Sequence, residues 1–274
     1  MDRKIVYAGQ VPLETDLLGS NLYAMIGLGH LAQALIGTGT VASGLACTPT
    51  TPASMSVKIG AGSLYSPQNV DNSAYSSITA NTTDQIVKQA ILLASENKTL
   101  ALTAPTTPGN SVIYLIQAAY SDLDTDDTTL PYYNAANPSV PYSGPGGSGA
   151  AQSTRRKGAV NITAKVGIAS TSPVAPAPDS GFVGLYTITV AYGATTITSG
   201  NIAVASGAPF LTSGPYLTPP AAAAIYAPLT GATFTGNVTV QGSGSATLGT
   251  SGDITAARVG GADGLLFFGT SGTR

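Results

Sequence analysis

Charged residues are scarce in this chain of 274 residues, because Asp, Glu, Lys and Arg make up only 9% of it. An average soluble domain carries about a quarter of such residues. The formal net charge of -2 gives no strong surface potential, so we expect no nucleic-acid partner and no binding to an anionic membrane surface. We also expect no insertion into a membrane. A composition that is rich in Gly, Pro, Thr and Ser favours an extracellular structural protein over a cytosolic enzyme.

Tryptophan is absent, and cysteine and histidine each occur once. Cys47 has no partner for an internal disulfide, and we expect it to be a buried small hydrophobic residue. His30 has no second histidine or nearby cysteine for a zinc site, and no serine in the sequence context of a catalytic triad. The two glutamates, Glu14 and Glu96, lie in an arm and in a turn, which does not resemble a glycosidase pair. We therefore expect no enzyme, no cofactor and no metal site.

The segment from Leu17 to Ile36 is predicted to form a self-associating helix within an N-terminal region of residues 1–47. Thr15 or Asp16 is the expected N-cap, and Gly37-Thr38-Gly39 ends the segment. Small and apolar residues repeat at steps of 4, 3, 4, 3 and 4, which is a heptad spacing. The repeat comprises Leu18, Leu22, Met25, Gly29, Ala32 and Ile36. We expect all of them except Gly29 to form the core of a trimeric bundle.

Two other interpretations of this helix stay open. It is equally well explained as an amphipathic helix that docks on its own domain. A membrane span has the right length but is disfavoured, because Asn21, His30 and Gln33 interrupt it. The letters Gly27-Leu-Gly29-His-Leu-Ala32 also match a dinucleotide-binding fingerprint. That motif needs a preceding strand, whereas helical periodicity precedes it here, so we interpret the match as chance.

Residues 48–210 are predicted to form an antiparallel β-sandwich. Alternating or apolar runs separated by turns indicate strands near residues 55–59, 90–94, 99–103, 112–120, 160–168 and 182–192. We expect the second and third of these to form a hairpin around Ser95–Lys98. A long loop from Pro131 to Lys157 contains Tyr132, Tyr133 and Tyr142. We expect these tyrosines to pack the loop down, and sugar stacking is the alternative.

An acidic run, Asp122-Leu-Asp-Thr-Asp-Asp127, follows one predicted strand and partly resembles a calcium loop. The glycine and the final glutamate of such a loop are missing, so we expect a solvated turn and keep calcium as the alternative. The basic run from Arg155 to Lys157 is able to hold these acids in the same or a neighbouring subunit.

The C-terminal part is predicted to be a Pro/Ala linker, residues 211–225, followed by the start of a fibre shaft, residues 226–274. Its apolar residues, Leu229, Phe234, Val238 and Val240, are too far apart to bury one another within one chain. Identical copies that wrap together would bury them, so we expect these residues to continue the threefold core. The apolar run at residues 264–268 leads us to expect that the native polypeptide continues past Arg274.

Several segments resemble tail-fibre proteins of tailed bacteriophages. Tyr226-Ala-Pro-Leu-Thr-Gly-Ala-Thr-Phe-Thr-Gly236 is similar to the sequence motif with which the shafts of these proteins begin. Residues 2–18, 45–50 and 130–139 are similar to N-terminal modules of phage tail proteins. The resemblance implies a homotrimeric virion protein that anchors to the phage tail or baseplate and carries a receptor-binding tip beyond this chain. It brings no catalytic residue.

Two alternative functions follow from the same observations. One is a carbohydrate-binding or polysaccharide-depolymerising tailspike module. The other is a bacterial surface adhesin, which needs an export signal, and the run Ile5 to Ala8 is too short to be one. We therefore expect synthesis in the host cytoplasm and localisation in the virion.

Overall fold

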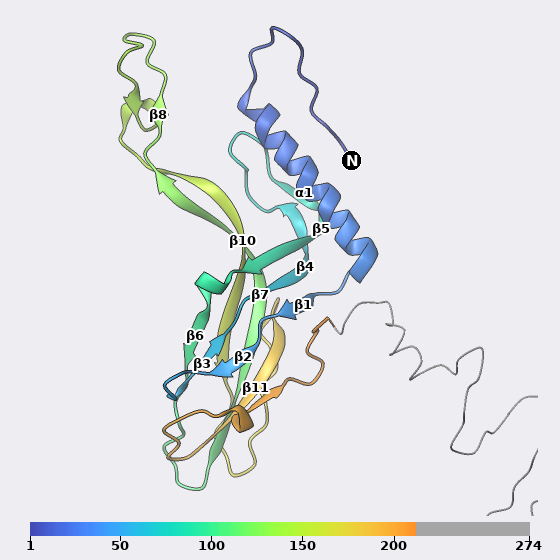
Figure 1. Ribbon diagram of the computed structural model, residues 1–274, viewed down its shortest axis with the longest axis vertical. Helices are drawn as coiled ribbons and strands as arrows, with labels where there is room; N and C mark the ends of the chain where they lie inside the picture. The colour runs from blue at the N-terminus through green and yellow to red at the C-terminus, as the bar shows by residue number, and fades with distance from the viewer. Residues whose placement is uncertain (212–274) are drawn as a thin grey trace, which may run out of the picture. The chain divides into compact units, whose positions relative to one another are not determined.

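A computed structural model describes residues 1–211 (Figure 1). Residues 1–211 are mainly β, with 43% strand and 15% helix, and they have an N-terminal helix and several antiparallel sheets, as predicted. The linker after Leu211 and the shaft positions Leu229, Phe234, Val238 and Val240 lie outside the described residues. The trimeric bundle and the intertwined shaft therefore stay predictions.

The N-terminal helix, α1, comprises Glu14–Ile36. It begins earlier than predicted, because Leu13 is the N-cap and neither Thr15 nor Asp16 has that role. Asp16 lies inside the first turn, where its Oδ2 accepts a hydrogen bond of 3.0 Å from the Leu13 N–H. The predicted end is confirmed: Gly37 follows with a φ of 82°, a left-handed conformation that glycine adopts at little cost, and its N–H donates to the Gln33 carbonyl.

Within residues 1–211 all named strands pair antiparallel, and Ala42 of β1 also makes an isolated parallel bridge with Phe210. The strands form a four-stranded sheet, two three-stranded sheets and a two-stranded pair. The four-stranded sheet has the order β10 (Gln152–Val166), β7 (Ser111–Thr128), β11 (Val183–Ala191) and β12 (Ile202–Val204). One three-stranded sheet has the order β1 (Val41–Gly44), β4 (Gly62–Asp71) and β5 (Asn81–Leu92). The other has the order β2 (Cys47–Pro49), β3 (Ser56–Ile59) and β6 (Lys98–Ala101).

The predicted hairpin around Ser95–Lys98 is wrong. β5 and β6 are consecutive and are joined by a short 3₁₀ turn, η1 (Ala94–Glu96), but they belong to different sheets. β5 pairs with β4, whereas β6 pairs with β3. The turn is closed locally by a hydrogen bond from the Leu93 N–H to the Glu96 carboxylate, and the chain then enters the second sheet.

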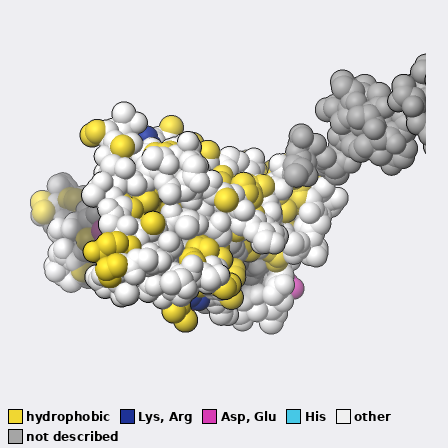
Figure 2. Space-filling model, turned by 90° about the horizontal axis from the view of Figure 1, so that it is seen from below, with side chains coloured by type: hydrophobic (Ala, Val, Ile, Leu, Met, Phe, Trp, Pro, Cys, Tyr) yellow, Lys and Arg dark blue, Asp and Glu magenta, His cyan; other side chains and the backbone are white. Residues whose placement is uncertain are grey.

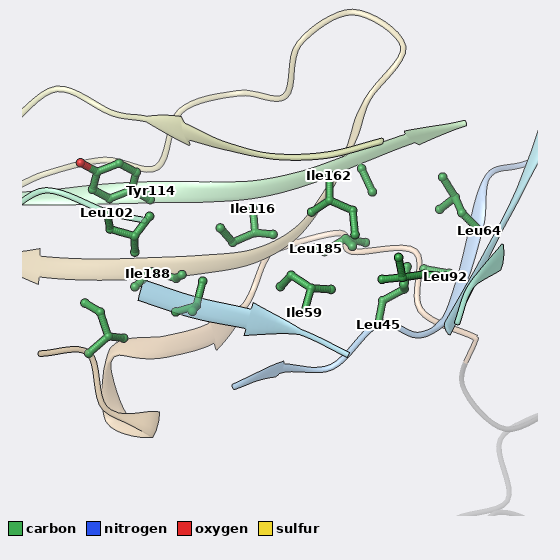
Figure 3. Packing of buried hydrophobic residues seen from close by; sticks show 14 of the residues in the cluster. Leu45, Ile59, Leu64, Leu92, Leu102, Tyr114, Ile116, Ile162, Leu185 and Ile188 are labelled. Atoms are coloured by element: carbon green, nitrogen blue, oxygen red, sulfur yellow. The ribbon is translucent and has the colours of Figure 1, made fainter. Parts of the chain in front are cut away.

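The hydrophobic core lies between the sheets and takes side chains from all three larger ones (Figure 3). Leu64 comes from β4, Ile59 from β3, and Ile116 and Ile188 from β7 and β11, and each is fully buried. Alternation along the strands explains this arrangement, because every second side chain points to the same face of a sheet. The three sheets therefore share one core and form one body.

Beyond Ala118, the last residue of β7 that pairs with β11, β7 and β10 continue as a long two-stranded arm (Figure 1). Their pairing runs from Thr128 opposite Gln152 to Tyr114 opposite Val166 in a single register. The predicted loop from Pro131 to Lys157 is therefore too long, because β10 already begins at Gln152. Inside the remaining tip, β8 (Pro131–Tyr132) pairs with β9 (Tyr142–Ser143).

Candidate interaction groove beside helix α1

One side of α1 packs on β5 of the same chain. Gly29 is buried there, and a Cβ added to it would lie 2.9 Å from the Ile86 Cβ and 3.1 Å from the Val87 carbonyl oxygen. The predicted heptad residues share this stripe with Gly29, and all of them are half-buried: Leu18, Leu22, Met25, Ala32 and Ile36. The docked arrangement is thus present within the chain. Whether these residues also form a core between chains stays a prediction.

A second side of α1 is covered by the N-terminal segment, which runs back along the helix. The Lys4 side chain lies against Gly19 and the Met1 side chain lies against Gly27. Lys4 Nζ is also 3.7 Å from the Asp16 carboxylate. Gly27 and Gly29 lie inside α1, and the residues before this helix form no strand, so the strand that the fingerprint requires is missing here.

A groove of about 770 Å³ opens between α1 and the strands beside it. Its helix wall is apolar and includes Met25, Leu28, Leu31 and Leu35. The opposite wall carries polar and charged side chains from β4, β5, β7 and β10, among them Asp71, Lys88, Tyr120 and Arg156. An apolar wall thus faces a charged one.

The charged wall is organised around Lys88, which is only 4% exposed. Its Nζ lies 2.8 Å from Asp122 Oδ2 and 3.8 Å from Asp71 Oδ1, and Asp71 is itself 4% exposed. The Tyr120 hydroxyl donates a hydrogen bond of 2.6 Å to the other oxygen of Asp122. Burial of a charge is tolerated when paired groups satisfy it, as they do here. Burial, followed by the contact with Asp122, raises the pKa of Tyr120 well above its ordinary range, so its hydroxyl keeps its proton.

Arg156 on β10 also belongs to this cluster and binds Asp124 through two parallel hydrogen bonds. Its Nε lies 2.7 Å from Asp124 Oδ1 and its Nη2 lies 2.8 Å from Oδ2. A third bond of 3.1 Å reaches Asp71, and the guanidinium lies over the Tyr75 ring at 5.5 Å. The hydrogen bonds from Arg156 lower the pKa of Asp124, and those to the carboxylates raise the pKa of Arg156. A bidentate pair fixes orientation as well as charge, so Arg156 holds the arm against the loop after β4.

The acidic run was wrongly predicted to be a turn, because residues 122–127 belong to strand β7. The basic run on β10 lies opposite, and the prediction that it holds these acids is confirmed within one chain. Arg155 pairs with Asp126 and Arg156 with Asp124, while Lys157 pairs with Glu96. Asp127 accepts a hydrogen bond from Ser153. Among residues 1–211, no three His, Cys, Asp or Glu side chains gather in a way that would hold a metal ion.

The remaining singled-out residues lie apart from the groove. Cys47 on β2 is half-buried, and burial raises the pKa of its thiol to about 12. At the tip of the arm, the Tyr132 hydroxyl donates to Gln152 and the Tyr142 ring lies beside Gly147, whereas Tyr133 is 78% exposed. His30 is exposed on α1.

Sequence reasoning missed the charged wall. The available signal was Lys88, a lysine that interrupts an otherwise buried run, Ile86-Val87-Lys88, in β5. Its partner Asp71 ends β4, a strand that was not predicted. On the face in Figure 2, hydrophobic clusters are separated mainly by uncharged atoms.

Comparison with protein-family models, curated proteins and solved structures gives no match to this chain. No helix in the part of the chain that the structure describes is both long and apolar enough to cross a bilayer.

Proposed function

We propose that this chain is a structural, non-enzymatic component of a tailed-phage tail fibre that assembles as a homotrimer in the virion. In this proposal residues 1–211 form the part that anchors to the tail or baseplate. The shaft that follows supports a distal tip that attaches to the host surface.

The observation that carries the proposal is a contrast between the two walls of the groove. On the charged wall, the described side chains form ion pairs: Lys88 pairs with Asp122, and Arg156 pairs with Asp124. The apolar helix wall, in contrast, remains open, with Leu28 66% exposed and Leu35 53% exposed. Large exposed apolar patches mark interaction sites, whereas paired charges hold a fold together. The resemblance of Tyr226–Gly236 to a fibre-shaft phrase gives this interaction surface its context.

Two measurements test the proposal. Light scattering of the intact chain is expected to give three times the chain mass of 27.2 kDa. Labelled chain in phage particles is expected at the tail, at the base of a fibre, by electron microscopy. A single-chain mass at micromolar concentration, or label elsewhere in the particle, would contradict it.

The alternative is a carbohydrate-binding or polysaccharide-depolymerising tailspike module. One observation favours it, namely the exposure of Tyr133 and Tyr142 at the tip of the arm, because exposed aromatic rings are suited to stacking. Binding of this chain alone to host polysaccharide, lost in Tyr133→Ala, would support the alternative. Turnover of the polysaccharide would establish the depolymerising form.

A further inference from the structure

The exposed side of α1 carries a second heptad stripe, displaced by one residue from the predicted one. Its residues are Leu17, Asn21, Ala24, Leu28, Leu31 and Leu35, at steps of 4, 3, 4, 3 and 4. We call them the outer stripe. Every one of them is exposed, whereas every residue of the stripe from Leu18 to Ile36 is at least half-buried. The four leucines are 53–72% exposed.

The outer stripe is the side of α1 that residues 1–211 leave uncovered. A shift of one residue turns a helix by about 100°, so the outer stripe lies beside the side that packs on β5. The N-terminal segment covers a different side, at Gly19 and Gly27. Two sides of the helix are thus covered by other parts of the described chain, and the third is apolar and is not covered by any residue up to Leu211.

The period of the outer stripe specifies the kind of partner. A repeat of 3.5 residues keeps an apolar seam facing a second helix along its length, which is the geometry of coiled coils. Packing against a flat sheet or an extended peptide would not require the residues of the stripe to be spaced at steps of 4, 3, 4, 3 and 4. The occupant is therefore a helix that runs alongside α1.

The charges of α1 indicate that this helix is another copy of itself. From Leu17 to Ile36 there is no Asp, Glu, Lys or Arg, although surface helices usually have charged outer faces. Identical surfaces that meet about a symmetry axis bring like charges together, so a charge-free stripe suits self-contact. A different partner would more commonly be selected by complementary charges at the edges of the seam.

We propose that the outer stripes of neighbouring copies pack on one another as parallel helices around the trimer axis. This inference rests on the proposed function, because a fibre requires all copies to run in the same direction. The inference assigns the contact between chains to Leu28, Leu31 and Leu35. The stripe from Leu18 to Ile36, which includes Met25, stays packed against β5. Asn21 lies within the seam, where a polar residue fixes register and the number of helices.

Cysteine cross-linking of the full chain tests the assignment. The native thiol is removed by Cys47→Ala, and Leu28→Cys or Leu35→Cys is introduced singly. Parallel copies bring these positions close to the axis, and mild oxidation is expected to give a covalent dimer. Ala34→Cys is the matched control, because Ala34 is exposed on the same helix but outside the stripe. Met25→Cys reports on the stripe from Leu18 to Ile36.

The expected result is a dimer yield more than about tenfold higher at Leu28 and Leu35 than at Ala34 or Met25, since a disulfide forms only between closely spaced Cα atoms. A trimeric wild-type mass with equal yields at all positions, or with cross-linking at Met25 in place of Leu28, would overturn the inference and leave the fibre proposal standing. A wild-type chain that is monomeric overturns both.

Discussion

The Lys88 ammonium on β5 lies 2.8 Å from the Asp122 carboxylate on β7, and Lys88 is only 4% exposed. This pair joins the sheet that supports α1 to the four-stranded sheet. Asp71 and Tyr120 complete the surroundings of the two charges. The charged wall of the groove therefore also holds two sheets together.

Lys88→Met is expected to destabilise the protein. The substitution removes the cation and leaves Asp122 with only the Tyr120 hydroxyl among its described side-chain partners. Removal of one partner of a buried pair costs about 3–5 kcal/mol. Urea unfolding followed by circular dichroism measures the loss.

Lys165→Met is the matched control for this lysine. Lys165 pairs with Asp179 at an exposed position, where both side chains are more than 30% exposed. An exposed pair contributes about 1 kcal/mol or less. Equal losses for the two variants would show that burial of Lys88 has no special weight.

Gly29→Ala is expected to weaken the packing of α1 against β5. The new methyl group would meet the Ile86 Cβ at 2.9 Å and the Val87 carbonyl oxygen at 3.1 Å, and neither atom is the end of a flexible side chain. Overpacking of this kind costs about 1–3 kcal/mol, which exceeds the gain of up to about 1 kcal/mol from replacing a helical glycine. Thermal unfolding of the variant measures the net effect.

Gly27→Ala serves as the comparison on the same helix. Its Cβ would meet the side chain of Met1, whose flexible end is free to move aside. The helix-propensity gain then prevails, and the variant is expected to be as stable as wild type or more so. A loss equal to that of Gly29→Ala would contradict the close approach to β5.

Acidification is expected to lower the stability of the protein. The pKa of Asp124 is lowered by hydrogen bonds from Arg156, and the pKa of Glu96 by its hydrogen bond from Lys157. The folded chain therefore binds these protons less readily than the unfolded chain does. Their stabilisation is present above the ordinary carboxyl pKa of about 4 and is lost as the pH falls through the lower, folded values.

Thermal midpoints between pH 7 and pH 2 check this expectation. The decline is expected to begin near pH 4, and in Arg156→Gln to be shallower, because Asp124 then has a more ordinary pKa. A midpoint that rises on acidification would contradict the sign.

The Cys47 thiol is expected to resist alkylation in the folded protein. Its pKa of about 12 leaves far fewer thiolates at pH 8 than an ordinary cysteine has, and the thiolate is the reactive form. Labelling is expected to be roughly a hundredfold slower than in guanidinium chloride, measured by mass spectrometry. Equal rates in the two conditions would refute it.

The local parts of the fold are predictable from the sequence. The helical repeat ends at Ile36 as expected, and alternation places the strands at Ser56–Ile59 and Val183–Ala191 within about two residues. Strand pairing is less predictable, because β6 turns away from its neighbour β5 to join β3. The choice depends on which apolar faces meet in the core, which no short window of sequence contains.

The candidate site was predictable only in part, for an electrostatic reason. Four acids between Asp122 and Asp127 repel one another when they are considered alone, and this favours a turn. On β10, Arg156 lies directly across from Asp124, and Arg155, which lies across from Thr125, pairs with the neighbouring Asp126. Cross-strand attraction then extends β7 through the acidic run. The heptad at Leu18 was visible in the sequence, but which stripe of α1 faces β5 depends on the fold.

The single register of β7 and β10 gives the arm a mechanical role. The same pair of strands that enters the core at Tyr114 and Ile162 continues to the tip at Thr128 and Gln152. We therefore expect a displacement of the tip to be transmitted along two hydrogen-bonded strands to the packed interior. The ion pairs of Arg155 with Asp126 and Arg156 with Asp124 also join the two strands of the arm.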